Sequence, residues 1–129
     1  MLREQIEALQ AYLQQLIQVR DSVIKAMDSI RALNKVEGSI LVYLDPHMNV
    51  AITVNPLERD RMLVHLGLNV YAKLGVEEAL KVLEERRARL DKAVEETRRT
   101  IGNLVNLHDQ YQAALQRILA QAAQARERG

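Results

Sequence analysis

Two heptad repeats flank a central segment that holds both prolines, and this arrangement limits the folds that the chain can adopt. Pro46 and Pro56 lie between residues 38 and 75, whereas the flanks 1–37 and 76–128 contain no proline. Three of the five glycines lie in the same central segment. Because proline and glycine interrupt helices, the sequence predicts a long helix, a punctuated middle and a second long helix.

In the first flank, aliphatic residues recur every seven positions in two offset sets. The sets are Leu2, Leu9, Leu16, Val23 and Ile30, and then Ile6, Leu13 and Met27. Only Arg20 interrupts the second set. A 3.5-residue repeat keeps one stripe facing a partner helix, so we expect a coiled-coil helix over residues 2–37. Gly38 stands where a left-handed glycine commonly closes a helix.

The last flank carries a longer repeat of the same kind. Its sets are Leu80, Arg87, Val94, Ile101, His108, Leu115 and Ala122, and then Leu83, Leu90, Thr97, Leu104, Tyr111, Ile118 and Ala125. Most of these positions are apolar, which predicts a coiled-coil helix over residues 76–128. Gly75 is the expected N-cap, and Glu77 and Glu78 would lie in the first turn, where the helix dipole favours acids.

In the middle segment the apolar period changes from 3.5 residues to 2, which is typical of half-buried strands. The first expected hairpin pairs Ile40, Val42 and Leu44 with Met48, Val50, Ile52 and Val54, through a connection at Asp45-Pro46-His47. The second pairs Met62, Val64 and Leu66 with Leu68, Val70, Ala72 and Leu74, turning around Gly67 to Asn69. Residues Asn55 to Glu58 have the pattern of a single helical turn.

The predicted fold class is α+β, mainly α, with two β-hairpins between two long helices. The helices can fold back as an antiparallel coiled-coil hairpin or form two parallel coiled coils with other chains. A lone hairpin is marginally stable in water, and its unpaired edges invite further pairing. Leu41, Tyr43 and Leu63 also make two of the strands apolar on both faces. We therefore predict an oligomer assembled through the middle segment.

The two helices differ in length, which leaves part of the second without a partner. At about 1.5 Å per residue, helix 2–37 spans roughly 54 Å and helix 76–126 roughly 76 Å. If they pair from the β segment outward, Leu2 lies level with about residue 110, and residues 112–128 project. This projecting segment still carries aliphatic residues, so it is either mobile or available to another molecule. A third alternative is that the start methionine is misplaced and that a missing N-terminal stretch covers the segment.

Charge and residue types exclude several function classes. Lys+Arg is 18 and Asp+Glu is 17, which gives no electrostatic reason to expect nucleic acid or an anionic membrane. Cysteine is absent, and the three histidines are too scattered for a metal site. No nucleophile–base pair and no phosphate-binding loop is present. We therefore expect no enzyme and no cofactor, and, without a visible signal peptide or membrane span, a cytoplasmic location.

Three blocks of the chain match a known family in order and spacing. They are Ile40-Leu41-Val42-Tyr43-Leu44, then Val64-His65-Leu66-Gly67-Leu68-Asn69-Val70-Tyr71-Ala72-Lys73, then Val76-Glu77-Glu78-Ala79-Leu80. On these blocks the chain resembles the alpha type of archaeal prefoldin subunit, a hexameric cochaperone, and two hairpins rather than one favour alpha over beta. Gly67-Leu68-Asn69 replaces a more glycine-rich turn, and the first helix is short for the family.

The resemblance covers essentially the whole chain and implies a single prefoldin-like module over residues 1–129. Residues 1–37 and 76–128 would be the two helices of a long antiparallel coiled-coil hairpin, and residues 38–75 its assembly segment with the two β-hairpins. In that family two alpha and four beta subunits join their hairpins into a double β-barrel platform. The distal coiled-coil tips hold unfolded proteins, without ATP, for delivery to a group II chaperonin.

Carried onto this sequence, the resemblance nominates two sets of residues. The client-binding tips would be Leu2, Ile6, Leu9, Leu115, Ile118, Leu119 and Ala122. The assembly hairpins would present Ile40, Val42, Leu44, Val50, Ile52, Val54, Val64, Leu66, Val70 and Ala72. The alternative function is a structural coiled-coil adaptor with one specific protein partner.

Overall fold

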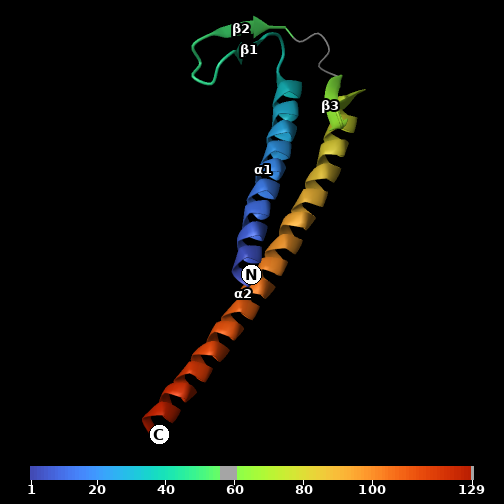
Figure 1. Cartoon of the computed structure of the whole chain (residues 1–129). Coiled ribbons are helices and arrows are strands. Elements are labelled where there is room, and N and C mark those ends of the chain that lie inside the picture. The colour runs from blue at the N-terminus through green and yellow to red at the C-terminus, as the bar shows by residue number, and fades with distance from the viewer. Residues whose placement is uncertain (56–60, 129) are drawn as a thin grey trace. The chain divides into compact units, whose positions relative to one another are not determined.

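The computed structural model describes residues 1–55 and 61–128, which form two long helices and two β-hairpins (Figure 1). The order is α1 (Leu2–Lys35), β1 (Ile40–Tyr43), β2 (Ala51–Val54), β3 (Met62–Gly67), β4 (Val70–Leu74) and α2 (Val76–Arg128). This order confirms the predicted mainly α fold with two hairpins between the helices. The predicted helical turn from Asn55 to Glu58 falls on residues 56–60, outside the described residues.

The chain divides into two compact units, which we describe one at a time. One unit contains Met1–Val19 and Leu90–Gly129. Here Leu13 of α1 shares a groove with Arg98 and Ile101 of α2, and Leu2 shares another with His108. The earlier residue of α1, Leu2, lies beside the later residue of α2, His108, so the two helices are antiparallel in this unit. This is one of the two expected arrangements.

The second unit contains Arg20–Arg89 and holds most of the buried side chains. Its buried apolar residues are Val23, Met27, Val64, Ala79 and Leu83. In this unit, Ile30 of α1, Val64 of β3 and Leu83 of α2 line one groove, so the two helices and the second hairpin meet there. The Arg86 side chain reinforces this packing, because its Nη2 donates a 2.7 Å hydrogen bond to the His65 carbonyl oxygen.

The first hairpin is antiparallel, with Ile40 opposite Val54 and Val42 opposite Ile52. The connection is longer than predicted, since β2 begins at Ala51 and not at Met48. Met48 instead has a left-handed φ of 62° in the loop, so its predicted place in the strand is wrong. Short polar side chains stabilise such loops by bonding nearby backbone, and here Asp45 accepts the N–H groups of Asn49 and Val50.

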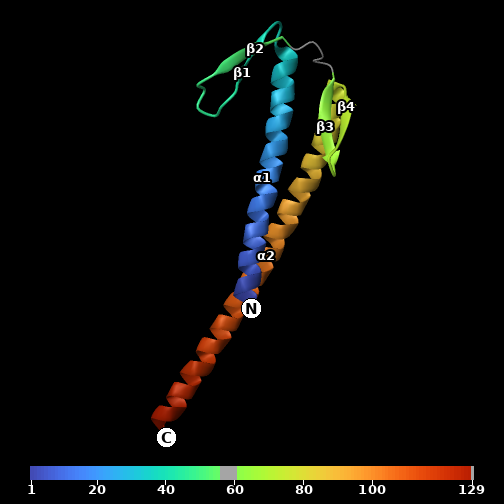
Figure 2. The same ribbon diagram turned by 45° about the horizontal axis from the view of Figure 1, so that its top comes forward.

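The second hairpin, formed by β3 and β4 (Figure 2), turns at Leu68 and Asn69, within the predicted stretch from Gly67 to Asn69. Both residues have positive φ, 49° and 62°, the pattern of a two-residue turn whose twist matches the flanking strands. Leu68 therefore lies in the turn and not in the strand that was expected to begin with it. Gly67, at φ 124°, provides a conformation suited to glycine where the strand register shifts.

The helix ends follow the expected signals closely at one junction and less closely at the other. The Gly75 carbonyl accepts the N–H of Ala79 at 2.8 Å, as an N-cap residue does, and α2 begins at Val76. In contrast, α1 ends at Lys35, two residues earlier than predicted. Gly38 does adopt a left-handed φ of 84°, but beyond the two non-helical residues Val36 and Glu37.

Candidate functional site

The last part of α2 is a helix whose apolar side chains face solvent. We define residues 111–128 as the α2 extension. Its large apolar residues are Tyr111, Leu115, Ile118 and Leu119, with 51% to 62% of their surface exposed. By contrast, the preceding seam residues are covered, with Val94 buried and Ile101 and Leu104 half-buried. Exposure therefore rises beyond the groove that Leu2 of α1 lines together with His108 and Gln112 of α2.

The α2 extension remains helical without a packed partner because of its composition. Residues 110–125 include six alanines and five glutamines, which are good helix formers, and only one charged residue, Arg117. A partnerless helix normally depends on such local propensity, since tertiary packing contributes nothing to it. The sequence therefore maintains an exposed aliphatic stripe on a preformed helix.

The tip residues nominated on the two helices are in different environments. Leu2, Ile6 and Leu9 of α1 are half-buried. Leu2 and Ile6 line a groove of about 490 Å³ together with His108 and Gln112. These α1 residues belong to the helix seam, whereas Leu115, Ile118, Leu119 and Ala122 of α2 are exposed. Accessible apolar surface at this end of the coiled coil thus comes mainly from α2.

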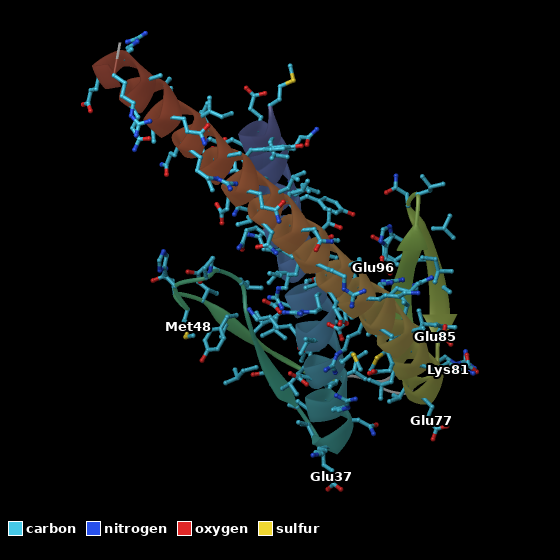
Figure 3. All side chains as sticks on the ribbon, turned by 90° about the horizontal axis from the view of Figure 1, so that it is seen from below. Glu37, Met48, Glu77, Lys81, Glu85 and Glu96 are labelled. Atoms are coloured by element: carbon cyan, nitrogen blue, oxygen red, sulfur yellow. The ribbon has the colours of Figure 1, made fainter. Side chains whose placement is uncertain are left out.

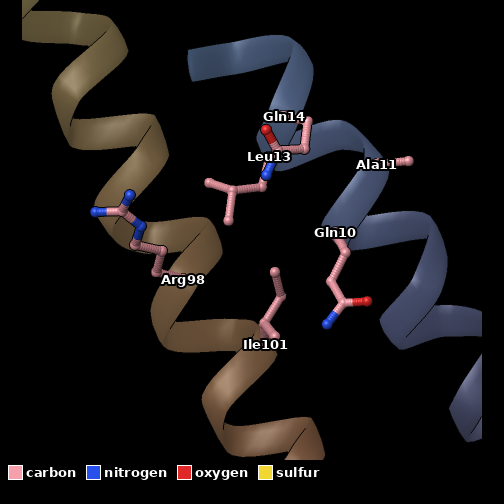
Figure 4. Close-up of a pocket in the computed structure, with 6 residues that line it drawn as sticks. All are labelled: Gln10, Ala11, Leu13, Gln14, Arg98 and Ile101. Carbon is pink, nitrogen blue, oxygen red and sulfur yellow. The ribbon is translucent and has the colours of Figure 1, made fainter. Parts of the chain in front are cut away.

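Between the two helices of the same unit, a groove lies beside the seam. Figure 4 shows Leu13 and Ile101 pointing toward each other from α1 and α2, while Ala11 points away. Gln10, Gln14 and Arg98 complete a groove of about 510 Å³ around them. Leu13 and Ile101 are half-buried, so this part of the seam is only partly covered within the chain.

The nominated hairpin residues divide into an inward and an outward group. Val64 is 7% exposed, and Ile40, Val54 and Ala72 are half-buried. The outward group, exposed in the single chain, is Val42, Leu44, Val50, Ile52, Leu66 and Val70. Val64 thus packs into its own chain, while the outward group leaves the hairpins with uncovered aliphatic surface of the kind that marks interaction sites.

The predicted assembly residues do not include Tyr71 and Leu63 of the second hairpin, nor the contacts that His65 makes there. Tyr71 and Leu63 are also more than half exposed, on the same hairpin. The Tyr71 ring lies 5.0 Å from that of His65, directly across the two strands. The sequence does carry a signal for Leu63, because this residue makes its strand apolar on both faces. However, the Arg86 bond to His65 joins residues 21 positions apart and leaves no local signal.

The loop of the first hairpin contains Asp45, whose carboxylate accepts several hydrogen bonds from the same loop. Partial desolvation of Asp45 would raise its pKa. Hydrogen bonds from Val50 N–H, the Asn49 side chain, Asn49 N–H and His47 N–H outweigh this effect, and the pKa is lowered. These bonds stabilise the charged carboxylate. Asp45 therefore acts as a structural anion that organises the loop.

The acidic residues Glu77, Glu85 and Glu95 of α2 are solvent-exposed charges. Glu77, Lys81 and Glu85 follow one another at four-residue spacing on α2 (Figure 3), and all three are exposed. Glu95 forms a 3.7 Å ion pair with Arg99, also on the surface. Across residues 1–55 and 61–128, no group of three or more potential metal ligands comes together. Neither described helix is long and apolar enough to cross a membrane.

Comparison with known proteins identifies the family. The profile of the family described as "Prefoldin subunit" matches residues 2–121. The chain is 37% identical over 125 residues to prefoldin subunit alpha of Aeropyrum pernix, covering 96% of this chain and 83% of that one. It is 27% identical over 128 residues to the Saccharolobus solfataricus protein of the same name, covering 99% and 86%.

A solved structure supports the fold independently. A chain of filamentous PFD from Methanocaldococcus jannaschii aligns with a TM-score of 0.72 at 22% identity, covering 88% of this chain and 93% of that chain. Two long helices with two small antiparallel hairpins are therefore the fold expected of such subunits, which are chaperone components and generally not enzymes. Together with the match over residues 2–121, this establishes that the chain belongs to the prefoldin subunit family.

Proposed function

We propose that this chain is an ATP-independent holdase subunit that binds unfolded proteins at the coiled-coil tips, mainly through the α2 extension. The observation that carries this proposal is the run of exposed aliphatic side chains on the α2 extension. The bound protein would then pass to a group II chaperonin in the cytoplasm.

The chemistry of the α2 extension suits a surface that binds many sequences and releases them. Exposed Leu and Ile gain roughly 25 cal/mol per Å² of apolar surface removed from water, whatever the partner's sequence. Flexible aliphatic surfaces can repack around different partners. Each such contact is weak, so several arms of one complex acting on one chain would supply the affinity by avidity.

We assign the outward residues of the two hairpins to assembly with beta-type prefoldin subunits, in a complex of two alpha and four beta chains. Two-stranded hairpins with exposed edges and aliphatic faces are marginal alone and gain stability by further pairing. Joining of several such hairpins would close the β-barrel platform that a single chain lacks among its described residues.

Removal of residues 112–129 tests the holding function. We expect the truncated chain to assemble with a beta-type subunit as the full chain does, because the hairpins are intact. Suppression of aggregation of a chemically denatured client, followed by light scattering, should fall severalfold. Full activity of the truncated complex would reject the α2 extension as the holding surface and favour a structural adaptor.

A substitution pair refines this test without shortening the helix. Leu115→Gln with Ile118→Gln removes the apolar surface while keeping good helix formers. The matched control, Gln116→Ala with Gln124→Ala, changes two exposed residues away from the stripe. We expect the first pair to lose most of the holding activity and the control pair to retain it.

A further inference from the structure

The apolar stripe of the α2 extension continues the same seam that α1 covers earlier along α2. At about 100° per residue, one face of the α2 extension carries Tyr111, Ala114, Leu115, Ile118, Ala122 and Ala125. The face is in heptad register with Val94 and Ile101, which the chain itself buries or half-buries. A surface that continues an existing helix–helix interface is shaped for another helix.

The backbone of α2 favours a helical ligand for a second reason. Every interior N–H and C=O of a helix is already paired, so the α2 extension offers a ligand side-chain contacts only. An extended segment would leave one edge of its own backbone without partners on this surface. The backbone groups of an amphipathic helix are already paired within that helix, so it can bind through its apolar side chains alone. The alanines at positions 114, 122 and 125 allow such a helix to approach closely.

Charged residues are distributed unequally around the stripe. Arg117, Arg126 and Arg128 fall on the faces beside it, whereas Asp109 and Glu127 fall on the opposite face. Long arginine side chains can extend along an apolar surface while keeping the guanidinium in water. The cationic side chains beside the stripe therefore lie near its middle, at Arg117, and at its C-terminal end, at Arg126 and Arg128.

From the continued helix seam, the paired backbone of α2 and the arginines beside the stripe, we infer that the α2 extension binds amphipathic helical segments that carry acidic residues beside their apolar stripe. This rests on the proposed function, because it names the class of client segment that the holding surface prefers. Segments with basic flanks, and segments unable to form a helix, bind the same surface more weakly.

Three fluorescein-labelled peptides test the inference by anisotropy with the full chain. All share one heptad pattern of Leu and Ile: the first has Glu at the flanking positions, the second has Lys, and the third has the Glu flanks with two central prolines. Exposed ion pairs are individually weak, so we expect the Glu peptide to bind about three- to tenfold more tightly than the Lys peptide at low salt. In about 0.5 M salt, where screening is strong, the ratio should approach one. The proline peptide should bind most weakly.

Equal binding of the Glu and Lys peptides at low salt would overturn the charge preference. Binding of the proline peptide as tight as that of its helical counterpart would overturn the helical ligand. Two variants locate the effect. Arg117→Glu with Arg126→Glu should reverse the preference between Glu and Lys peptides, whereas Gln116→Glu, on the opposite face, should leave it unchanged. A preference that survives the arginine reversal would place the binding elsewhere.

The Leu115→Gln and Ile118→Gln pair separates failure of this inference from failure of the proposed function. In one outcome, the substituted chain loses both client holding and peptide binding, and the unsubstituted chain binds the Glu and Lys peptides equally. That outcome would support the holdase function and reject the acidic preference. Retention of client holding in this pair would reject the holding surface itself, and the inference with it.

Discussion

At the residue scale, a few side chains and backbone angles determine the shape of each hairpin. The Asp45 carboxylate accepts four hydrogen bonds within one loop, and three of their donors are backbone N–H groups. Leu68 holds a left-handed conformation that an L-residue with a bulky side chain adopts at a penalty. Single substitutions at these positions should therefore change local stability in predictable directions.

Asp45 should make the first hairpin sensitive to acid. Its folded pKa is lower than the ordinary aspartate value, so its stabilising effect is complete above that ordinary value and is lost as pH falls through the folded pKa. The amide shifts of Asn49 and Val50, measured by NMR, should titrate with a midpoint below that of the unfolded loop peptide. Asp45→Asn should abolish this titration, and a midpoint at or above the peptide value would contradict the prediction.

Leu68→Gly should stabilise the second hairpin. Leu68 is 98% exposed, so little packing is lost, and glycine adopts its φ of 49° without strain. We expect a gain of about 1 kcal/mol in the free energy of unfolding, measured with urea. Leu68→Ala is the control, since it removes the exposed side chain but keeps the Cβ atom. Equal stability of the two variants would show that the backbone angle is not the cause.

At the element scale, the two helices differ in what stabilises them. The part of α2 that pairs with α1 buries seam residues such as Val94, whereas the α2 extension relies on alanine and glutamine. Gly102 lies in the paired part and is the residue of lowest helix propensity in α2. A Cβ atom added there would meet nothing within 4 Å.

Gly102→Ala should therefore stabilise α2 without disturbing its packing. The expected gain is about 1 kcal/mol, the difference in helix propensity between the two residues. Thermal unfolding followed by circular dichroism measures it. A lower midpoint for the variant would indicate that flexibility at this position, or a contact in the assembled complex, requires glycine.

At the scale of the whole molecule, exposed apolar surface is concentrated on the hairpins and on the α2 extension. The proposed function uses the hairpins for assembly and the α2 extension for clients. Sequence reasoning nominated Val64 and Val70 equally for assembly, but Val64 is buried in its own chain. A charge at Val64 would disrupt the subunit itself, so Val70 is the position that can test assembly.

Val70→Asp should block assembly while leaving the subunit folded. Val70 is 54% exposed, so the single chain loses little packing, but a buried unpaired charge in a β-barrel would be strongly unfavourable. Size-exclusion chromatography with a beta-type subunit should show the free chain. Asn69→Asp, which adds the same charge in the turn next to it, should assemble normally. Co-elution of Val70→Asp would reject this hairpin face as the assembly surface.

The sequence by itself determined the order of elements, the heptad registers, a turn within Gly67 to Asn69 and the cap at Gly75, because these depend on local periodicity and backbone preference. Only the tertiary structure decided that the helices pair antiparallel within each unit and that their seam is covered only as far as His108. The same is true of Val64, which faces inward, and of the hydrogen-bonded loop around Asp45, after which the second strand begins at Ala51. These outcomes depend on contacts between residues distant in sequence or on competition between hydrogen bonds, which a repeat pattern does not encode.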